Sequence, residues 1–156
     1  MSVAVGQPIP DLEVQATGAK TLKLSAFRGR HLVLYFYPKA STPGCTQEGQ
    51  DFRDACDDFA AADTVILGVS RDGLKAQESF KSRQNFPFDL LCDTDEALCR
   101  AFDTIKLKKL YGRESLGVER STFLIDSAGV LRREWRGVKV KGHAQEVLAA
   151  ARALSA

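Results

Sequence analysis

The sequence has 156 residues, about the length of one domain, and is long enough to bury a single hydrophobic core. With 44% hydrophobic and 27% charged residues, 12 glycines and 5 prolines, its composition excludes a disordered, collagen-like or low-complexity chain. The net charge is only +2, and the basic residues are interspersed with acidic ones, so we expect no binding to nucleic acid.

The amino terminus and the cysteines indicate the compartment. Residues 1–10 lack the cationic and apolar regions of a secretory signal, and no window approaches the roughly 18 apolar residues of a membrane span. We therefore expect a cytoplasmic protein that does not enter a membrane. The cysteines form no CxxC pair and are too scattered for a disulfide framework, so we expect free thiols at Cys45, Cys56, Cys92 and Cys99.

The first third of the chain predicts an edge hairpin, a central strand and a helix. Residues 3–23 alternate apolar and polar side chains around prolines and a glycine, which predicts short strands at the edge of the fold. Residues 31–37 form a nearly continuous apolar run, typical of a central strand covered on both faces. Beyond Pro38, apolar side chains at helical spacing predict one helix beginning near Cys45, with its stripe at Cys45, Gly49, Phe52, Cys56 and Phe59.

The remaining residues alternate strands and helices. Residues 64–70 and 88–92 predict buried strands, and residues 74–84 predict the helix of a β-α-β crossover between them. A short helix over 96–102, a cationic loop, strands over 121–126 and 130–135, and a final helix from about His143 follow. This order predicts a mixed α/β fold. Residues 1–156 show no repeat or linker, so we expect a single domain.

The segment that leads to Cys45 predicts a reactive thiol. A strand delivers a loop rich in proline and glycine, and Cys45 then stands at the expected helix amino terminus. The first backbone N–H groups of a helix lack partners within the helix, and their partial positive charge favours a thiolate over a thiol. Cysteine is also a common small core residue, so this position alone leaves both roles open.

The residues around Cys45 resemble the peroxiredoxins, whose signature P-x-x-x-T/S-x-x-C is matched by Pro38, Thr42 and Cys45. The longer run from residue 37 to residue 54 is similar to the peroxiredoxin Q branch, also called bacterioferritin comigratory proteins. Residues 117–126 and the Trp135, Val138, Gly142-His143 pattern extend this similarity. The resemblance implies a thioredoxin-like fold with an added N-terminal hairpin, and a central mixed sheet flanked by helices.

By this resemblance the protein reduces hydrogen peroxide and organic hydroperoxides through a sulfenic acid on Cys45, with no cofactor. Thr42 orients the peroxide, Pro38 shields the thiolate, and Arg120 supplies a permanent positive charge. Such a charge can stabilise the negative charge that develops on the departing oxygen. The resemblance further implies supporting roles for residues next to these: Glu48 holds the arginine, and Tyr37 and Gly44 shape the pocket and the turn before Cys45.

The thiol that regenerates Cys45 is the open question. The two usual positions of a second, resolving cysteine in this branch are occupied by Gln50 and Lys81. Cys56 follows 11 residues later on the expected helix, at roughly 16 Å, beyond the upper limit of about 7 Å for a disulfide. Cys92, at the end of a strand, is the least implausible internal resolver. We therefore favour a single-cysteine cycle.

In a single-cysteine cycle the partner is an external reductant, either thioredoxin, or glutathione with glutaredoxin. A cationic loop could attract an acidic reductant, although such loops are more often merely solvated; its basic residues are Lys106, Lys108, Lys109 and Arg113. We expect a monomer or weak dimer.

Three other functions have less support. A metal site needs closely spaced cysteines or histidines, whereas the only histidines are His31 and His143. A non-catalytic thioredoxin-like binding or chaperone module would not need the intact signature residues. A disulfide reductase would need a second cysteine where Thr42 stands.

Overall fold

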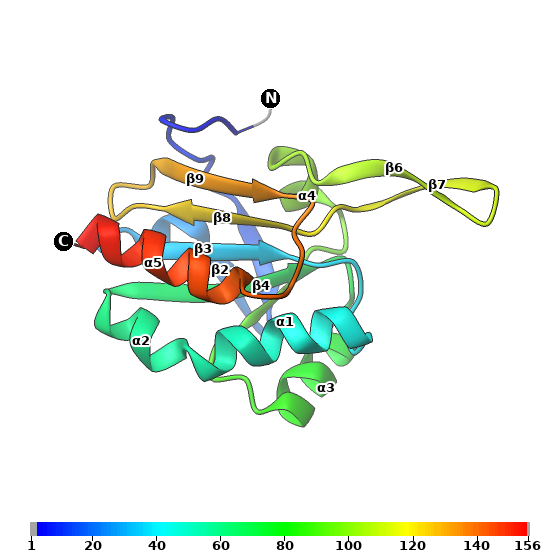
Figure 1. The fold of residues 1–156 in the computed structure, drawn as a ribbon, viewed down its shortest axis with the longest axis horizontal. Helices are drawn as coiled ribbons and strands as arrows, with labels where there is room; N and C mark the ends of the chain where they lie inside the picture. The colour runs from blue at the N-terminus through cyan, green and yellow to red at the C-terminus, as the bar shows by residue number, and fades with distance from the viewer. Residues whose placement is uncertain (1–2, 156) are drawn as a thin grey trace.

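A computed structural model describes residues 3–155, apart from the side chain of Leu110. Seven strands form one sheet in the order β2-β1-β5-β4-β3-β8-β9 (Figure 1). Their bounds are β1 Glu13–Ala16, β2 Lys20–Lys23, β3 His31–Phe36, β4 Thr64–Ser70, β5 Leu90–Cys92, β8 Ser121–Ile125 and β9 Leu131–Arg136. The mixed α/β architecture and the hairpin at the sheet edge (β1 and β2) are as predicted.

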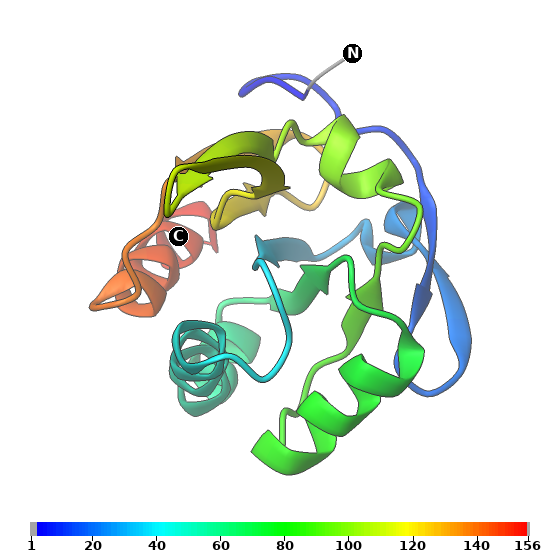
Figure 2. The same cartoon turned by 90° about the vertical axis from the view of Figure 1, so that its right-hand side faces the viewer.

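Helices cover both faces of this sheet. In Figure 2, α1, α3 and α5 lie on one side of the curved sheet, and α4 lies on the other. The helices are η1 Leu24–Phe27, α1 Pro43–Asp54, α2 Cys56–Ala61, α3 Leu74–Gln84, α4 Ala97–Ala101 and α5 His143–Ser155. Strand β4, helix α3 and strand β5 form the predicted crossover, because β4 and β5 pair in parallel.

Strand β3 divides the core. All six of its residues are buried between β4, which is parallel to it, and β8, which is antiparallel. Since successive side chains of a strand point to opposite faces, Val33 and Tyr35 join the core beneath α1 and α5, whereas Leu34 and Phe36 join the core beneath α4. Both faces are covered, as the apolar run predicted.

The single helix predicted from Cys45 to Phe59 is wrong, because a break at Ala55 separates α1 from α2. Ala55 has a non-helical ψ of 2°, and the hydrogen bond from the Phe59 N–H to the Ala55 carbonyl begins the next helix. Phe52 and Phe59 stay fully buried on either side. The interruption therefore leaves the spacing of buried side chains intact, and that spacing cannot reveal it.

The predicted cationic loop is also wrong: it is a two-stranded hairpin of β6 (Ile105–Leu110) and β7 (Arg113–Val118). Tyr111 and Gly112 both have positive φ, 52° and 75°, as a tight two-residue hairpin turn requires. The strands were missed because little of them is buried and because the alternation of apolar and basic residues in β6, from Ile105 to Lys108, stops after four residues at Lys109.

Among residues 3–155, no helix is long and apolar enough to cross a membrane. The cytoplasmic location stays a prediction.

Candidate active site

The loop between β3 and α1 places Cys45 in the first turn of a helix. Thr42 precedes the helix in an extended conformation, Pro43 is the first helical residue, and Cys45 is the third. The first helical hydrogen bond runs from the Thr46 N–H to the Thr42 carbonyl, at 2.8 Å. The backbone N–H groups of Gly44 and Cys45 precede this bond and remain available at the helix end. Cys45 therefore stands in the first turn of α1, as predicted, beside unpaired backbone N–H groups.

Arg120 connects the sulfur to a buried carboxylate. Its Nη2 lies 3.4 Å from Cys45 Sγ, and its Nη1 donates to Glu48 Oε1 at 2.7 Å. Cys45 and Glu48 are each only 1% exposed. A guanidinium can bridge two groups in this way because its N–H donors diverge in one rigid plane. The site therefore holds a fixed positive charge beside a nearly enclosed sulfur.

This close approach of Arg120 favours glycine at position 44. A Cβ atom at position 44 would lie 3.1 Å from Arg120 Nη2, which is tighter than nine in ten real Cβ contacts. Any larger residue would push the guanidinium away from the helix end. The structure thus gives Gly44 a steric role beside Arg120.

Burial dominates the titration of Glu48. Desolvation raises the pKa of this carboxyl from 4.5 to about 7, although the Arg120 guanidinium opposes the shift. Burial also acts on Arg120, but Glu48 and Cys45 more than offset it and raise the pKa of the guanidinium. Arg120 is therefore the constant charge of the site, and Glu48 is the group that changes protonation near neutral pH.

This shift predicts a pH-dependent stability difference between the wild type and Glu48→Gln. Below pH 4.5 the carboxyl is protonated in both the folded and the unfolded chain. Between pH 4.5 and 7 the unfolded carboxyl ionises first, so the wild type loses about 3 kcal/mol of stability as pH rises through this window. Glutamine does not titrate. Urea unfolding at pH 4 and pH 8 should show the difference moving in favour of Glu48→Gln by about that amount.

The control for this measurement is Glu78→Gln, an exposed position on α3. A difference between wild type and Glu48→Gln that does not change with pH would contradict the prediction.

Thr42 and Pro38 lie in the loop that faces this helix end. The Thr42 hydroxyl donates to the Lys39 carbonyl at 2.8 Å, which fixes its orientation and leaves its oxygen able to accept a hydrogen bond. Pro38 is half-buried and directly follows Tyr37, which is fully buried and belongs to the same apolar cluster as Cys45. Ser41 has a positive φ of 63°, an uncommon conformation for a serine. The loop is therefore held in one specific shape.

Two polar residues that we did not predict anchor this loop. The Ala40 N–H donates to Asp72 Oδ2 at 2.8 Å, and the Ser70 hydroxyl donates to the same oxygen at 2.6 Å. The Tyr37 hydroxyl donates to Gln77 Oε1 at 2.6 Å. One signal could have found Asp72, because it follows the carboxyl end of a parallel strand, where loops commonly build sites.

Asp72→Ala is expected to lower peroxidase kcat/KM about tenfold, because the 38–42 loop loses the acceptor that fixes it. Asp72→Asn should recover most of the activity, since its amide oxygen can still accept from the Ala40 N–H. Stopped-flow peroxide kinetics would measure both variants. Equal rates for Asp72→Ala and the wild type would refute this anchoring role.

The other cysteines are free and poorly suited to nucleophilic attack. Cys92 and Cys99 are buried, and burial raises the pKa of their thiols to about 11 and about 12. Burial also raises the pKa of Cys56, which begins α2. Cys92 lies on β5, which is separated from β3 by β4. A high pKa leaves little thiolate at neutral pH, so none of the three is suited to act as a nucleophile there.

The histidines do not come together as metal ligands. His143 shares a hydrogen bond of 2.8 Å with the Thr122 hydroxyl, and its ring packs edge-on against Phe52. His31 begins β3, at the end of the strand opposite to the loop that leads to Cys45. Within residues 3–155, no three histidine, cysteine or acidic side chains gather as a metal site would need.

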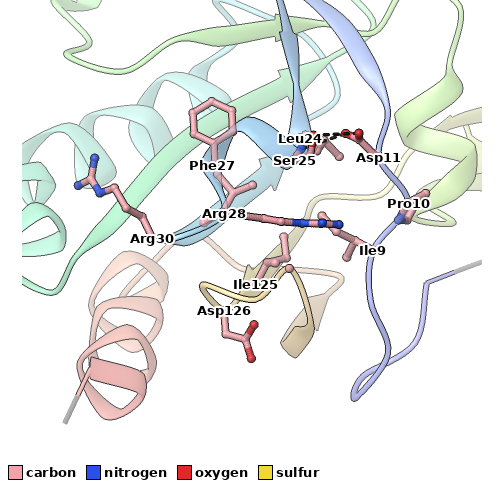
Figure 3. Close-up of a pocket in the computed structure, with 12 residues that line it drawn as sticks. Ile9, Pro10, Asp11, Leu24, Ser25, Phe27, Arg28, Arg30, Ile125 and Asp126 are labelled. Carbon is pink, nitrogen blue, oxygen red and sulfur yellow. Dashed lines mark hydrogen bonds between the residues drawn. The ribbon is translucent and has the colours of Figure 1, made fainter.

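A small, partly open pocket lies away from the Cys45 site (Figure 3). It has a volume of about 10 Å³, room for one water molecule, and Arg28 extends across it alongside Ile9 and Ile125. Its wall includes Leu32, near the start of β3, whereas Cys45 follows the end of that strand. This pocket therefore takes no part in the site.

Comparison with known proteins identifies the class. The fold is that of the thioredoxin-like thiol peroxidases, and the chain belongs to the AhpC/TSA family, whose model matches residues 5–134. The peroxiredoxin Bcp of Bacillus subtilis is 52% identical over 148 residues, which cover 95% of this chain and 94% of that relative. Within the family, the branch is that of Bcp, or peroxiredoxin Q, as the sequence predicted.

Solved structures support the same branch. Xanthomonas campestris peroxiredoxin Q has a TM-score of 0.92 and 49% identity, covering 97% of this chain and 99% of that one. A structure of the bacterioferritin comigratory protein of X. campestris, studied for its alkyl peroxide reduction activity, has a TM-score of 0.92 and 48% identity. It covers 98% of this chain and 100% of the other. The predicted fold class and enzyme class are thus confirmed.

Proposed function

We propose that this peroxidase reduces hydrogen peroxide and alkyl hydroperoxides by direct attack of the Cys45 thiolate. The observation that carries the proposal is the position of Arg120, 3.4 Å from Sγ and held by Glu48. The alkyl peroxide reduction described for the X. campestris relative supports the substrate class.

In the proposed reaction, the Cys45 sulfur attacks one peroxide oxygen. The S–O bond forms as the O–O bond breaks, the sulfur is oxidised to sulfenic acid, and the other oxygen leaves as hydroxide or alkoxide, which takes up a proton. Thr42 orients the peroxide through its hydroxyl. Arg120 and the free N–H groups at the start of α1 stabilise the charge that develops on the departing oxygen.

Recycling follows by an external thiol. A thiol attacks the sulfenic sulfur and releases water, which leaves a mixed disulfide; a second thiol then reduces this disulfide and frees Cys45. The two usual positions of a resolving cysteine hold Gln50 and Lys81, which have no thiol and make structural contacts instead. This supports a cycle that uses an external thiol. Gln50 Nε2 donates to Gln84 Oε1 at 2.8 Å, joining α1 to α3, and Lys81 donates to Asp89 at 2.8 Å.

The test is the intact mass of the reduced protein after one equivalent of hydrogen peroxide, with free thiols trapped by alkylation and the site located by peptide mapping. Addition of one oxygen at Cys45 alone would support the single-cysteine cycle. Loss of two hydrogens with Cys45 linked to Cys92 would establish an internal resolver instead. Cys45→Ser is the control. An unoxidised Cys45 would overturn the proposal and favour a non-catalytic thioredoxin-like binding module.

A further inference from the structure

The hairpin of β6 and β7 stands apart from the rest of the fold. It is a two-stranded sheet of its own, and Figure 1 shows it extending past the end of the molecule at which α1 begins. In the described part of the chain, neither of its outer edges pairs with another strand. Only its base is tied to the core, through Val118, which is fully buried, and Ile105, which packs against the same cluster.

One face of the hairpin carries exposed apolar side chains near its base, and the ion pair of Lys109 and Glu114 lies further out on the same face. Leu107 and Leu116 are cross-strand partners, and each is 61% exposed. Tyr111 at the tip is 96% exposed. Of the four large hydrophobic side chains that are exposed among the described residues, only Val5 lies elsewhere. A monomeric protein rarely gathers its exposed apolar side chains in one place unless that place binds a partner.

The hairpin also carries an excess of basic residues. It carries four of the 22 basic residues and one of the 20 acidic residues, so the rest of the chain is close to neutral. The strand register places Lys106, Lys108 and Arg113 on the face opposite to the leucines. The hairpin thus offers exposed leucines on one face and positive charge on the other, and a partner that contacts both needs apolar and acidic groups of its own.

The base of the hairpin adjoins the active site. Strand β7 is followed by Glu119 and then by Arg120, the residue that contacts Cys45 Sγ. Lys108 reaches back across Gly117 to donate to the Val118 carbonyl. Burial, together with the nearby charges of Arg120 and Arg71, lowers the pKa of Lys108, consistent with its position near the catalytic arginine. The base of the hairpin is therefore joined directly to the residue that contacts Cys45.

We propose that the β6–β7 hairpin is the docking surface for an acidic dithiol protein that reduces oxidised Cys45. This inference rests on the external-thiol cycle proposed above. The first thiol of the partner attacks the Cys45 sulfenic acid, giving a mixed disulfide and water. Its second thiol then displaces the Cys45 thiolate, which takes up a proton, and the partner leaves as an oxidised disulfide.

The test compares a small dithiol with two protein probes, a bacterial thioredoxin kept reduced by its reductase and a bacterial glutaredoxin with glutathione. Two double variants alter the surface, Lys106→Glu with Arg113→Glu, and Leu107→Ser with Leu116→Ser. Both should raise the KM for the more active protein probe by about tenfold. The charge variant should also weaken the dependence of KM on ionic strength. Peroxidase turnover with dithiothreitol should stay at the wild-type rate.

Matched controls are available outside the hairpin. Lys23→Glu with Arg83→Glu makes the same change of charge at exposed positions on β2 and α3, and Val5→Ser removes the other exposed hydrophobic side chain. These variants should keep the wild-type KM.

Three results would overturn the proposal. The hairpin variants could keep the wild-type KM, or neither protein could reduce Cys45 faster than dithiothreitol at equal thiol concentration. Sedimentation could also show that the variants only convert a dimer to a monomer, with KM unchanged, which would make the hairpin an interface between two copies of the chain. A wild type that reduces no peroxide even with dithiothreitol would instead refute the proposed function itself.

Discussion

Arg120→Lys is expected to lower kcat/KM for hydrogen peroxide by about 100-fold or more, with little change in the fraction of Cys45 thiolate at pH 7. Arg120 reaches Glu48 with one terminal nitrogen and Cys45 with the other. Lysine retains the positive charge that favours a thiolate, but its single nitrogen cannot hold both contacts in the same plane. The loss should therefore fall on the transition state.

Stopped-flow kinetics beside a thiol titration would separate the two effects of Arg120→Lys. The matched control is Arg136→Lys, because Arg136 also makes hydrogen bonds with its guanidinium, to the carbonyls of Phe102 and Asp103. A parallel and equal fall of turnover and thiolate fraction would show that Arg120 acts only by ionising the thiol.

Thr42→Val is expected to reduce the same rate constant about 100-fold, because it removes the hydroxyl and preserves the shape of the side chain. Ionisation alone cannot account for a loss of this size. A thiol with a pKa of about 8.5 is already a few per cent ionised at pH 7, so complete ionisation contributes only about 30-fold, or roughly 2 kcal/mol. Larger accelerations need groups that position the peroxide.

Thr42→Ser provides the control, since it restores a hydroxyl that can donate to the Lys39 carbonyl. Its kcat/KM should return to within about threefold of the wild-type value. Equal activity of the valine and serine variants would remove the hydroxyl from the mechanism.

The parts of the fold that could be predicted are those whose side chains face a core. Strand β4 and helix α3 begin and end at the predicted residues, because apolar runs and helical spacing record burial directly. The strands of the β6–β7 hairpin were missed because little of them is buried. The helix break at Ala55 was missed for the opposite reason, since the buried stripe runs through it.

The candidate site likewise has residues that could be predicted from the sequence and residues that could not. The signature around Cys45 predicted which side chains surround the sulfur, and the structure brings Cys45, Glu48 and Arg120 into contact. The anchors Asp72 and Gln77 could not be predicted with the same precision. Their partners, the Ala40 N–H and the Tyr37 hydroxyl, are more than 30 residues away in the sequence, and only the tertiary fold brings them together.

The hydrogen bond between Gln50 and Gln84 has a consequence for the fate of the oxidised enzyme. Where a resolving cysteine stands, it meets the sulfenic acid within the same molecule, at a rate that does not depend on any concentration. In the proposed cycle the sulfenic acid must wait for a collision, either with a reductant or with a second peroxide that oxidises it irreversibly. The fraction of enzyme lost in each turnover would then follow the ratio of peroxide to reductant. The amount of irreversibly oxidised protein would therefore increase as that ratio rises.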